Sequence, residues 1–349
     1  MELPKRAVFA FNANIDHLKA VGDGDMGLID AASFSLASQM SGSFAEGRQK
    51  ETLIDAKTCA ALLSKIRFDC SVVGGQAGNA TEQASALGVE CFLHSNFANS
   101  ELLSRFSKRK RILLAGKDGF VPAGEFSSQA PSAHHFVFED KESRTRFIAS
   151  YDPLPMHLEE NFQRAADSIL PSASKAFVGG FHLLKTPDRL AKFTDEILRW
   201  KRISPGLCVF AELGEFQSEA VRDAVRERLF PIVDMIGLND TELSSFGCDL
   251  SELAQEANTV LFHMPERQEV LPAGKLDREA MAFAEKCASF KAENGRCATL
   301  PELESHEARF LESPKWTVGL GDTFSCAYFM AASASVLKQN PSNEALLRP

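Results

Sequence analysis

The alternation that predicts the fold lies between residues 176 and 238 of the 349-residue chain. Three apolar runs, AFV (176–178), LCVFA (207–211) and IVDMIGL (232–238), alternate there with two amphipathic segments. The first segment repeats apolar side chains at helical spacing, at Leu190, Phe193, Ile197 and Trp200. Strand and helix in strict succession are what a parallel sheet covered by helices requires. We therefore expect an α/β fold.

The same pattern continues toward both ends of the chain. Short apolar runs predict further strands over 7–11, 91–94 and 112–115. A helix is expected over 80–87, where Gly88 stops it, and another over 277–290.

Two stretches interrupt this alternation. Residues 21–48 are rich in Gly, Ser and Asp, and residues 134–151 hold two apolar runs around a charged turn. The second stretch is typical of a β-hairpin. We expect short β segments from both places to form one small accessory sheet beside the large unit.

Composition restricts the function. The chain has 38 Lys and Arg against 47 Asp and Glu, a net charge of −9, which disfavours nucleic acid or an anionic membrane as partner. Its eight cysteines are dispersed and none forms a CxxC pair, as expected of free thiols in a reducing compartment. No apolar run approaches the roughly 18 residues of a membrane helix, and the N-terminal run is too short for a signal peptide. We expect a cytoplasmic protein.

The most specific segment is TVGLGDT (317–323), which precedes an apolar helix expected over 324–334. Gly319 and Gly321 let a ligand approach the backbone, and the N-terminus of the helix offers free N–H groups to an anion. Asp322 within this turn can take a proton from a hydroxyl. The alternative is a glycine-rich turn in which Asp322 only caps the helix.

Two further segments offer polar groups suited to a polyol. GGQAGN (74–79) lies directly before a helix, with Gln76 and Asn79 as donors and acceptors. NANID (12–16) follows the first strand, and ligands of open α/β sheets bind at the carboxyl ends of strands. The alternatives are an ordinary tight turn for the first segment and a hydrated loop for the second.

A fourth segment, NDTE (239–242), follows the strand over 232–238. Asn239 and Glu242 face the same way on a helical turn, and Glu212 ends the preceding strand. The two carboxylates could hold Mg²⁺ through water, but the same spacing also fits a helix capping box.

Taken together and in this order, the four segments resemble the ADP-dependent sugar kinases (glucokinase and phosphofructokinase) of the ribokinase-like superfamily. The resemblance covers about 5–260 and 310–335 and implies a three-layer α/β/α sandwich with a small β-sheet lid. We expect one ribokinase-like unit over 1–349, with the large domain near 1–13, 52–119 and 152–349 and the lid near 14–51 and 120–151.

The resemblance also implies roles at the phosphate end of the site. Asp322 resembles the base that deprotonates the sugar hydroxyl, beside an anion hole at Gly319, Leu320 and Gly321. Asn239 and Glu242 match the family's NxxE motif, which positions Mg²⁺ and phosphate through water, and Glu212 matches a strand-end glutamate near the metal. His263, in LFHM (261–264), matches a strand of the adenine pocket.

The resemblance also implies which residues bind the sugar, namely Asn14, Asp16, Gly75, Gln76 and Asn79. His182 can reach the sugar, although a purely structural histidine is the alternative, and Glu51 matches a glutamate from the lid. The resemblance implies ADP as phosphoryl donor, Mg²⁺ as cofactor and in-line transfer to a sugar hydroxyl.

The chain departs from the family in two places. Asp240 stands where Glu is usual, and only 77 positions (319 − 242) separate Glu242 from Gly319, where the family is longer. Arg48 stands where the glucose-using members have a second lid glutamate, which favours fructose 6-phosphate, with Arg146 and Lys185 as further candidates for its phosphate. An ADP-dependent glucokinase, an ATP-dependent ribokinase-like kinase and a non-catalytic relative are the alternatives.

Overall fold

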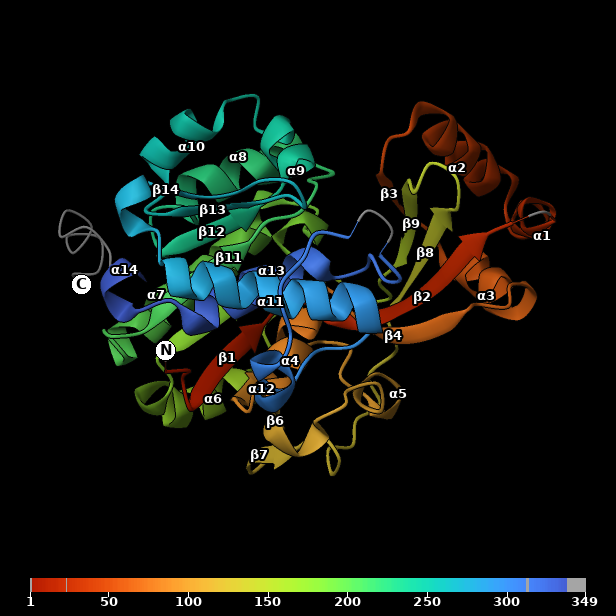
Figure 1. Cartoon of the computed structure of the whole chain (residues 1–349). Helices are drawn as coiled ribbons and strands as arrows, with labels where there is room; N and C mark the ends of the chain where they lie inside the picture. The colour runs from red at the N-terminus through yellow and green to blue at the C-terminus, as the bar shows by residue number, and fades with distance from the viewer. Residues whose placement is uncertain (1, 23, 312–313, 338–349) are drawn as a thin grey trace.

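The computed structural model describes residues 2–22, 24–311 and 314–337, so the last part of the range expected for the large domain, 338–349, lies outside it. Two sheets organise the described chain, a large one and a small one to its right in Figure 1. No helix within these residues has both the length and the apolar character to cross a bilayer.

The large sheet has nine strands, parallel in its interior and antiparallel at both edges. In spatial order they are β14 (Gln268–Leu271), β13 (Val260–His263), β12 (Met235–Leu238), β11 (Cys208–Glu212), β10 (Lys175–Val178), β1 (Arg6–Ala10), β5 (Glu90–Leu93), β6 (Ile112–Gly116) and β7 (Gly119–Pro122). The central strands are buried on both faces, which explains their continuous apolar runs.

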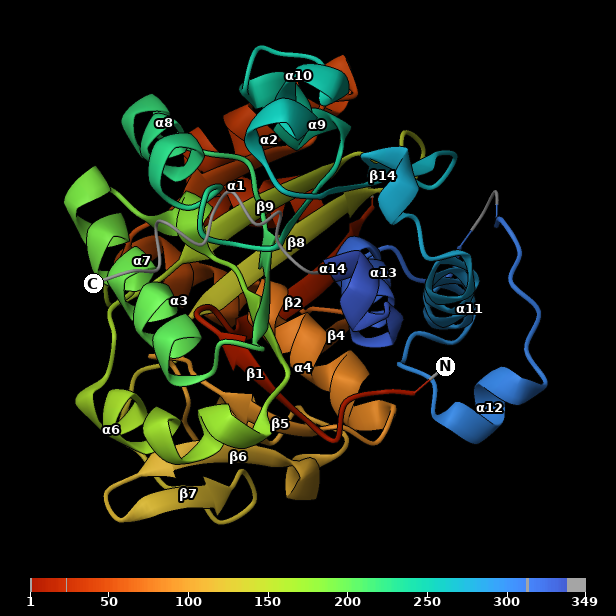
Figure 2. The same ribbon diagram turned by 90° about the vertical axis from the view of Figure 1, so that its left-hand side faces the viewer.

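Helices cover both faces of this sheet and complete the three layers. One face packs against α4 (Gln76–Ala86), α5 (Ser100–Leu103), α11 (Arg278–Asn294), α12 (Leu300–Glu304), α13 (Leu320–Ala331) and α14 (Ala334–Leu337). The other packs against α6 (Glu160–Ile169), α7 (Pro187–Ile203), α8 (Glu219–Arg228), α9 (Asp240–Ser245) and α10 (Leu250–Glu256). Successive strand residues alternate between the two cores, as Phe9 and Val8 do. Figure 2 shows α11 lying alongside α13.

The small sheet draws its five strands from three parts of the chain. In order they are β3 (Lys50–Leu53), β9 (Arg146–Tyr151), β8 (His134–Asp140), β2 (Asn14–Val21) and β4 (Cys70–Gly74). The helices α1 (Asp25–Ala32), α2 (Phe34–Glu46) and α3 (Ala56–Lys65) cover one of its faces. The alternate residues of β8 and β9, among them His135, Val137 and Ile148, face the other way, toward the large sheet.

The expected α/β architecture with a small sheet is confirmed, and so is the hairpin, as β8 and β9. Three segments differ from the expectation. Residues 21–48 form α1 and α2 rather than strands, because Ser33 caps α2 at Leu36 N–H and Gly47 ends it at φ 62°. The strand β4, expected in the large domain, pairs with β2 in the small sheet, and β7, expected at the edge of the lid, belongs to the large sheet.

Candidate functional site

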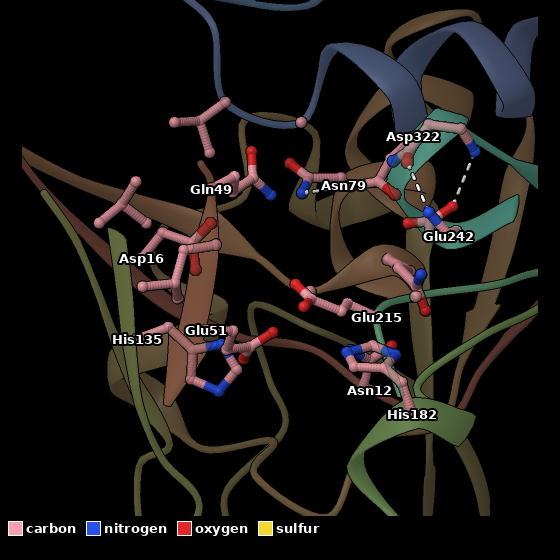
Figure 3. Close-up of a pocket in the computed structure, with 18 of the residues that line it drawn as sticks. Asn12, Asp16, Gln49, Glu51, Asn79, His135, His182, Glu215, Glu242 and Asp322 are labelled. Carbon is pink, nitrogen blue, oxygen red and sulfur yellow. Dashed lines mark hydrogen bonds between the residues drawn. The ribbon is translucent and has the colours of Figure 1, made fainter. Parts of the chain in front are cut away.

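The parallel topology brings the carboxyl ends of β1, β10, β11, β12 and β13 to one edge, under the open face of the small sheet. A cavity of about 170 Å³ lies there. Figure 3 shows Asp16, Glu51 and His135 on one side of it and Asp322 and Glu242 on the other. Its lining includes Asn12, Asp16, Gln49, Glu51, Gly75, Gln76, Asn79, His135, His182, Glu215, Asn239, Glu242, Gly319 and Asp322.

Asp322 lies in the first turn of α13, which Gly319 precedes at φ 64°. This left-handed conformation favours glycine, and a Cβ at Gly319 would also come within 2.6 Å of Asn79 Oδ1. The Asn79 side-chain amide donates to Asp322 Oδ2 at 3.0 Å. Within the described chain, the N–H groups of Leu320, Gly321 and Asp322 form no hydrogen bond, and a helix N-terminus of this kind attracts anions.

Burial raises the pKa of Asp322 to about 7, and the nearby Glu212 carboxylate adds to this rise, while Lys291 and Asn79 counteract it. A carboxylate with this pKa can accept a proton near neutral pH and still be ionised. The geometry and the pKa therefore suit a general base.

If Asp322 is that base, turnover should fall as the pH drops through about 7, because the protonated carboxyl cannot accept a proton. Well below this pH we expect about a tenfold loss of kcat/KM per pH unit. A pH–rate profile between about pH 5.5 and 8.5 measures it, at temperatures where the chain stays folded. A flat acidic limb would contradict the assignment.

The carboxyl groups of Glu212 and Glu242 lie close enough to Asp322 to interact with it electrostatically. Asn239 and Glu242 form a reciprocal capping box, with Asn239 N–H donating to Glu242 Oε2 at 2.9 Å, so the capping alternative is correct and Glu242 also lines the cavity. Burial, with the Glu212 carboxylate as second cause, raises the pKa of Glu242 to about 8. Glu212 Oε2 is buried without a partner among the described residues.

His263 lies apart from the cavity lining. Its Nε2 is 2.8 Å from Glu212 Oε1, and its ring packs beneath Gly321, where a Cβ would come within 2.9 Å of it. Although burial alone would lower the pKa of His263, Glu212 raises it. The ring of His263 thus orients the Glu212 carboxylate, and its place in an adenine pocket stays a prediction.

Asp16 lies on the side of the cavity formed by the small sheet, where the resemblance predicts the sugar. Asn14 Nδ2 donates to Asp16 Oδ1 at 2.6 Å, and Gly74 leaves room for the carboxylate, since a Cβ there would lie 2.0 Å from the same oxygen. Burial raises the pKa of Asp16 to about 6, against the opposing effect of His135. Asn14 itself does not line the cavity and acts on it through Asp16.

Gln76 lines the cavity, but both ends of its amide are engaged by backbone. Its Nε2 donates to Leu213 O, and its Oε1 accepts from Gly180 N–H at 2.6 Å, which joins the ends of β10 and β11 to α4. His182 is wedged against Gly214, and burial lowers its pKa, so its ring is neutral. Gln76 therefore shapes the cavity floor, and His182 also lines the cavity, with its Nδ1 atom buried against Gly214 and without a partner in the described chain.

Several residues in or next to the cavity were not predicted from the sequence, namely Asn12, Gln49, His135, Glu215 and Lys291. His135 contacts Asp152 at 3.2 Å, and although burial opposes its charged form, Asp152 raises its pKa to about 9. Burial, with Glu51 as second cause, raises the pKa of Glu215. His135 is the register partner of Asp16, a pairing between two strands far apart in the chain that the sequence does not reveal.

The basic candidates for a sugar phosphate lie outside the cavity lining. Arg48 and Lys185 are exposed on the surface. Arg146 projects from β9 toward the turn before α13, where it donates to Thr317 O at 3.3 Å. Glu51, by contrast, lines the cavity as expected and accepts a hydrogen bond from Ser150 Oγ.

Comparisons with known proteins identify the family and the fold. The family model described as the ADP-specific phosphofructokinase/glucokinase conserved region matches residues 31–277. An ADP-dependent kinase in complex with fructose-6-phosphate and ADPbetaS is similar in structure, with a TM-score of 0.77 and 17% identity over 97% of this chain and 95% of that one.

Two further solved structures share the fold. The last common ancestor of ADP-dependent phosphofructokinases from Methanosarcinales gives a TM-score of 0.74 at 17% identity, over 97% of this chain and 95% of that one. A phosphofructokinase from Pyrococcus horikoshii OT3 with AMP gives 0.71 at 16% identity, over 96% and 99%. Among curated protein sequences none matches significantly. Because the family model spans well over half of the residues, the chain belongs to the ADP-specific phosphofructokinase/glucokinase family.

Proposed function

We propose that this chain transfers the β-phosphate of ADP to a sugar hydroxyl, with Asp322 as general base. One observation carries the proposal: a half-buried carboxylate with a pKa near 7 lies in the first turn of α13, at the edge of a polar cavity. Family membership supports ADP as the donor.

The residues divide the reaction between them. Asp16 and Glu51 hold sugar hydroxyls at the lid end of the cavity, and this binding directs the acceptor hydroxyl toward Asp322. Asp322 accepts the hydroxyl proton. The N–H groups of Leu320 and Gly321 stabilise the charge on the transferred phosphoryl group, because they are already oriented when the charge develops. The small sheet excludes water from the cavity.

The carboxylates of Glu212 and Glu242 fit a divalent cation. Among the described residues Glu212 Oε2 is buried without a partner, and burial and Glu212 raise the pKa of Glu242. A cation between the two carboxyl groups would favour the ionised form of both. No three metal-ligating side chains converge on one point in the described residues, which suits an ion that keeps much of its water shell. Mg²⁺ bound there would neutralise phosphate charge.

The charge of the cavity favours an unphosphorylated sugar. Five carboxylates line it, namely those of Asp16, Glu51, Glu215, Glu242 and Asp322, and within the described chain no Lys or Arg does. A sugar phosphate would bring its own dianion against Asp16, Glu51 and Glu215. The chief cations that act on these groups, His135 on Asp16 and Lys50 on Glu215, are fewer than the carboxylates. Arg48, on which the fructose 6-phosphate prediction rests, lies on the surface. We therefore place an unphosphorylated hexose first and fructose 6-phosphate second.

A coupled assay tests donor and acceptor together. The purified chain is offered ADP or ATP with glucose or fructose 6-phosphate, each with Mg²⁺ and again with excess EDTA. We expect turnover with ADP and glucose, a kcat/KM at least about 10-fold lower for fructose 6-phosphate, and loss of turnover in EDTA.

The other outcomes identify the alternatives. A higher kcat/KM with fructose 6-phosphate would restore the sugar phosphate as substrate, and turnover only with ATP would place the chain with the ATP-dependent ribokinase-like enzymes. No turnover with any pair, alongside measurable sugar binding in calorimetry, would mean a non-catalytic relative.

A further inference from the structure

A buried lysine, Lys291, lies close to Asp322 and belongs to none of the four motif segments of the sequence. Lys291, on α11, is 6% exposed and points its ammonium group at the start of α13. The Nζ atom donates to Gly319 O at 3.1 Å, to Thr323 Oγ1 at 3.0 Å and to Asn79 Oδ1 at 3.5 Å. Two of these acceptors belong to the turn that carries Asp322, and the third is the side chain that bonds to Asp322.

Asn79 connects Lys291 to Asp322. Its Oδ1 accepts from Lys291, and its Nδ2 donates to Asp322 Oδ2, so the orientation of the amide is fixed from both sides. Lys291 also lowers the pKa of Asp322, against burial and Glu212. The lysine thus acts on Asp322 both through this amide and through its charge.

The position of Lys291 is electrostatically unusual. The N-terminus of a helix is its positive end, so a cation buried there is disfavoured unless an anion lies close by. A second buried lysine, at the other end of α13, shows the ordinary arrangement. Lys175, on β10 and 7% exposed, donates to the carbonyls of Phe329 (2.6 Å), Met330 (2.9 Å) and Ala332 (2.8 Å) at the C-terminal end of α13. Lys175 satisfies free carbonyl groups at the negative C-terminal end of α13. Lys291, by contrast, adds positive charge at the positive N-terminal end of the same helix.

We propose that Lys291 is a positioning residue for phosphoryl transfer. It fixes the Gly319–Asp322 turn and the Asn79 amide, and it holds positive charge behind the N-terminus of α13, where the transferred phosphate lies. The proposal rests on the function proposed above. Lys291 does not line the cavity, so it acts on the substrates through the turn and not by contact.

The test compares the same substitution at the two ends of α13. In K291M and in K175M, a buried lysine with three hydrogen bonds is replaced by an apolar side chain, and both variants should lower the unfolding temperature because buried acceptors lose their donor. Below both unfolding temperatures, we expect K291M to lose about 10- to 100-fold in kcat with KM for the sugar unchanged. K175M should keep the kcat of the unchanged chain. If K291M does not fold, K291Q, which keeps a donor and removes the charge, is measured in its place.

A K291M variant that keeps its kcat, or that loses no more than K175M does, would overturn the proposal. A rise in the sugar KM that matches the loss of kcat would do the same, since it would indicate general loosening of the cavity. If the unchanged chain has no ADP-dependent turnover, the proposed function fails, and calorimetry with ADP then tests Lys291 alone. There we expect K291M to bind ADP several-fold more weakly than K175M, and equal affinities would count against the proposal.

Discussion

Replacement of Asp322 by Asn should lower kcat by about 10³-fold while ADP still binds nearly as tightly as before. Asparagine has the shape of aspartate and its oxygen can accept from Asn79 Nδ2, but its amide cannot take the hydroxyl proton. The fold should not suffer, because burial raises the pKa of Asp322 to about 7, well above that of an unfolded chain. Ionised Asp322 therefore destabilises the folded state as the pH rises toward 7, and D322N removes that effect.

The matched control for D322N is D277N. Asp277 caps α11 through Ala280 N–H, a bond that Asn keeps, while its second oxygen accepts from Ser333 N–H, a bond that Asn loses. This variant should therefore lose some stability and keep its kcat. Steady-state kinetics and ADP calorimetry on the two variants decide the matter. A D322N variant that retains a tenth or more of the kcat of the unchanged chain would show that another group takes the proton.

Replacement of Asp16 by Ala should weaken use of the sugar by about 100-fold in kcat/KM, mainly through KM. Asp16 is a buried carboxylate at the lid end of the cavity, and hydrogen bonds from sugar hydroxyls to a charged group contribute about 1.5–3 kcal/mol each. Losing about 3 kcal/mol corresponds to roughly 100-fold in affinity. The KM for ADP should change little, since Asp16 lies across the cavity from Asp322.

The control for D16A is D69N, in the same part of the chain. Asp69 is exposed and accepts from Ala20 N–H at 2.7 Å, a bond that Asn can keep. D69N should therefore leave the KM for the sugar and for ADP unchanged. If D16A left the sugar KM as it is in the unchanged chain, the sugar site would lie elsewhere than at Asp16.

Much of the geometry around Asp322 and Glu242 could be predicted because it depends on neighbours along the chain. The glycines of TVGLGDT, the helix that follows and the NDTE spacing are readable in a few consecutive residues. The structure bears out their geometry, with Gly319 at φ 64° and a capping box at Asn239 and Glu242. The alternation of strands and helices was readable for the same reason, since buried parallel strands need unbroken apolar runs.

The side chains of other candidates have contacts that the sequence could not give. Gln76 has the composition of a sugar ligand, yet its amide bonds to Leu213 O and Gly180 N–H, both more than a hundred residues away. His263 could have been placed by strand parity. Leu261 packs into the core that contains α13, and His263, two residues on, shares its face and lies beneath Gly321.

The sequence by itself determined the α/β architecture, the order of the phosphate and sugar segments, and Asp322 as the candidate base, because each depends on neighbours along the chain. Only the tertiary structure decided which charges surround Asp322 and what lines the cavity. Lys291, His135 and Glu215 come from separate parts of the fold. From the sequence alone, a lysine on a helix such as Lys291 is expected to face solvent, because lysine is seldom fully buried. Their contacts, burial and pKa values arise only when those elements pack together, and burial then determines how strongly each charge acts.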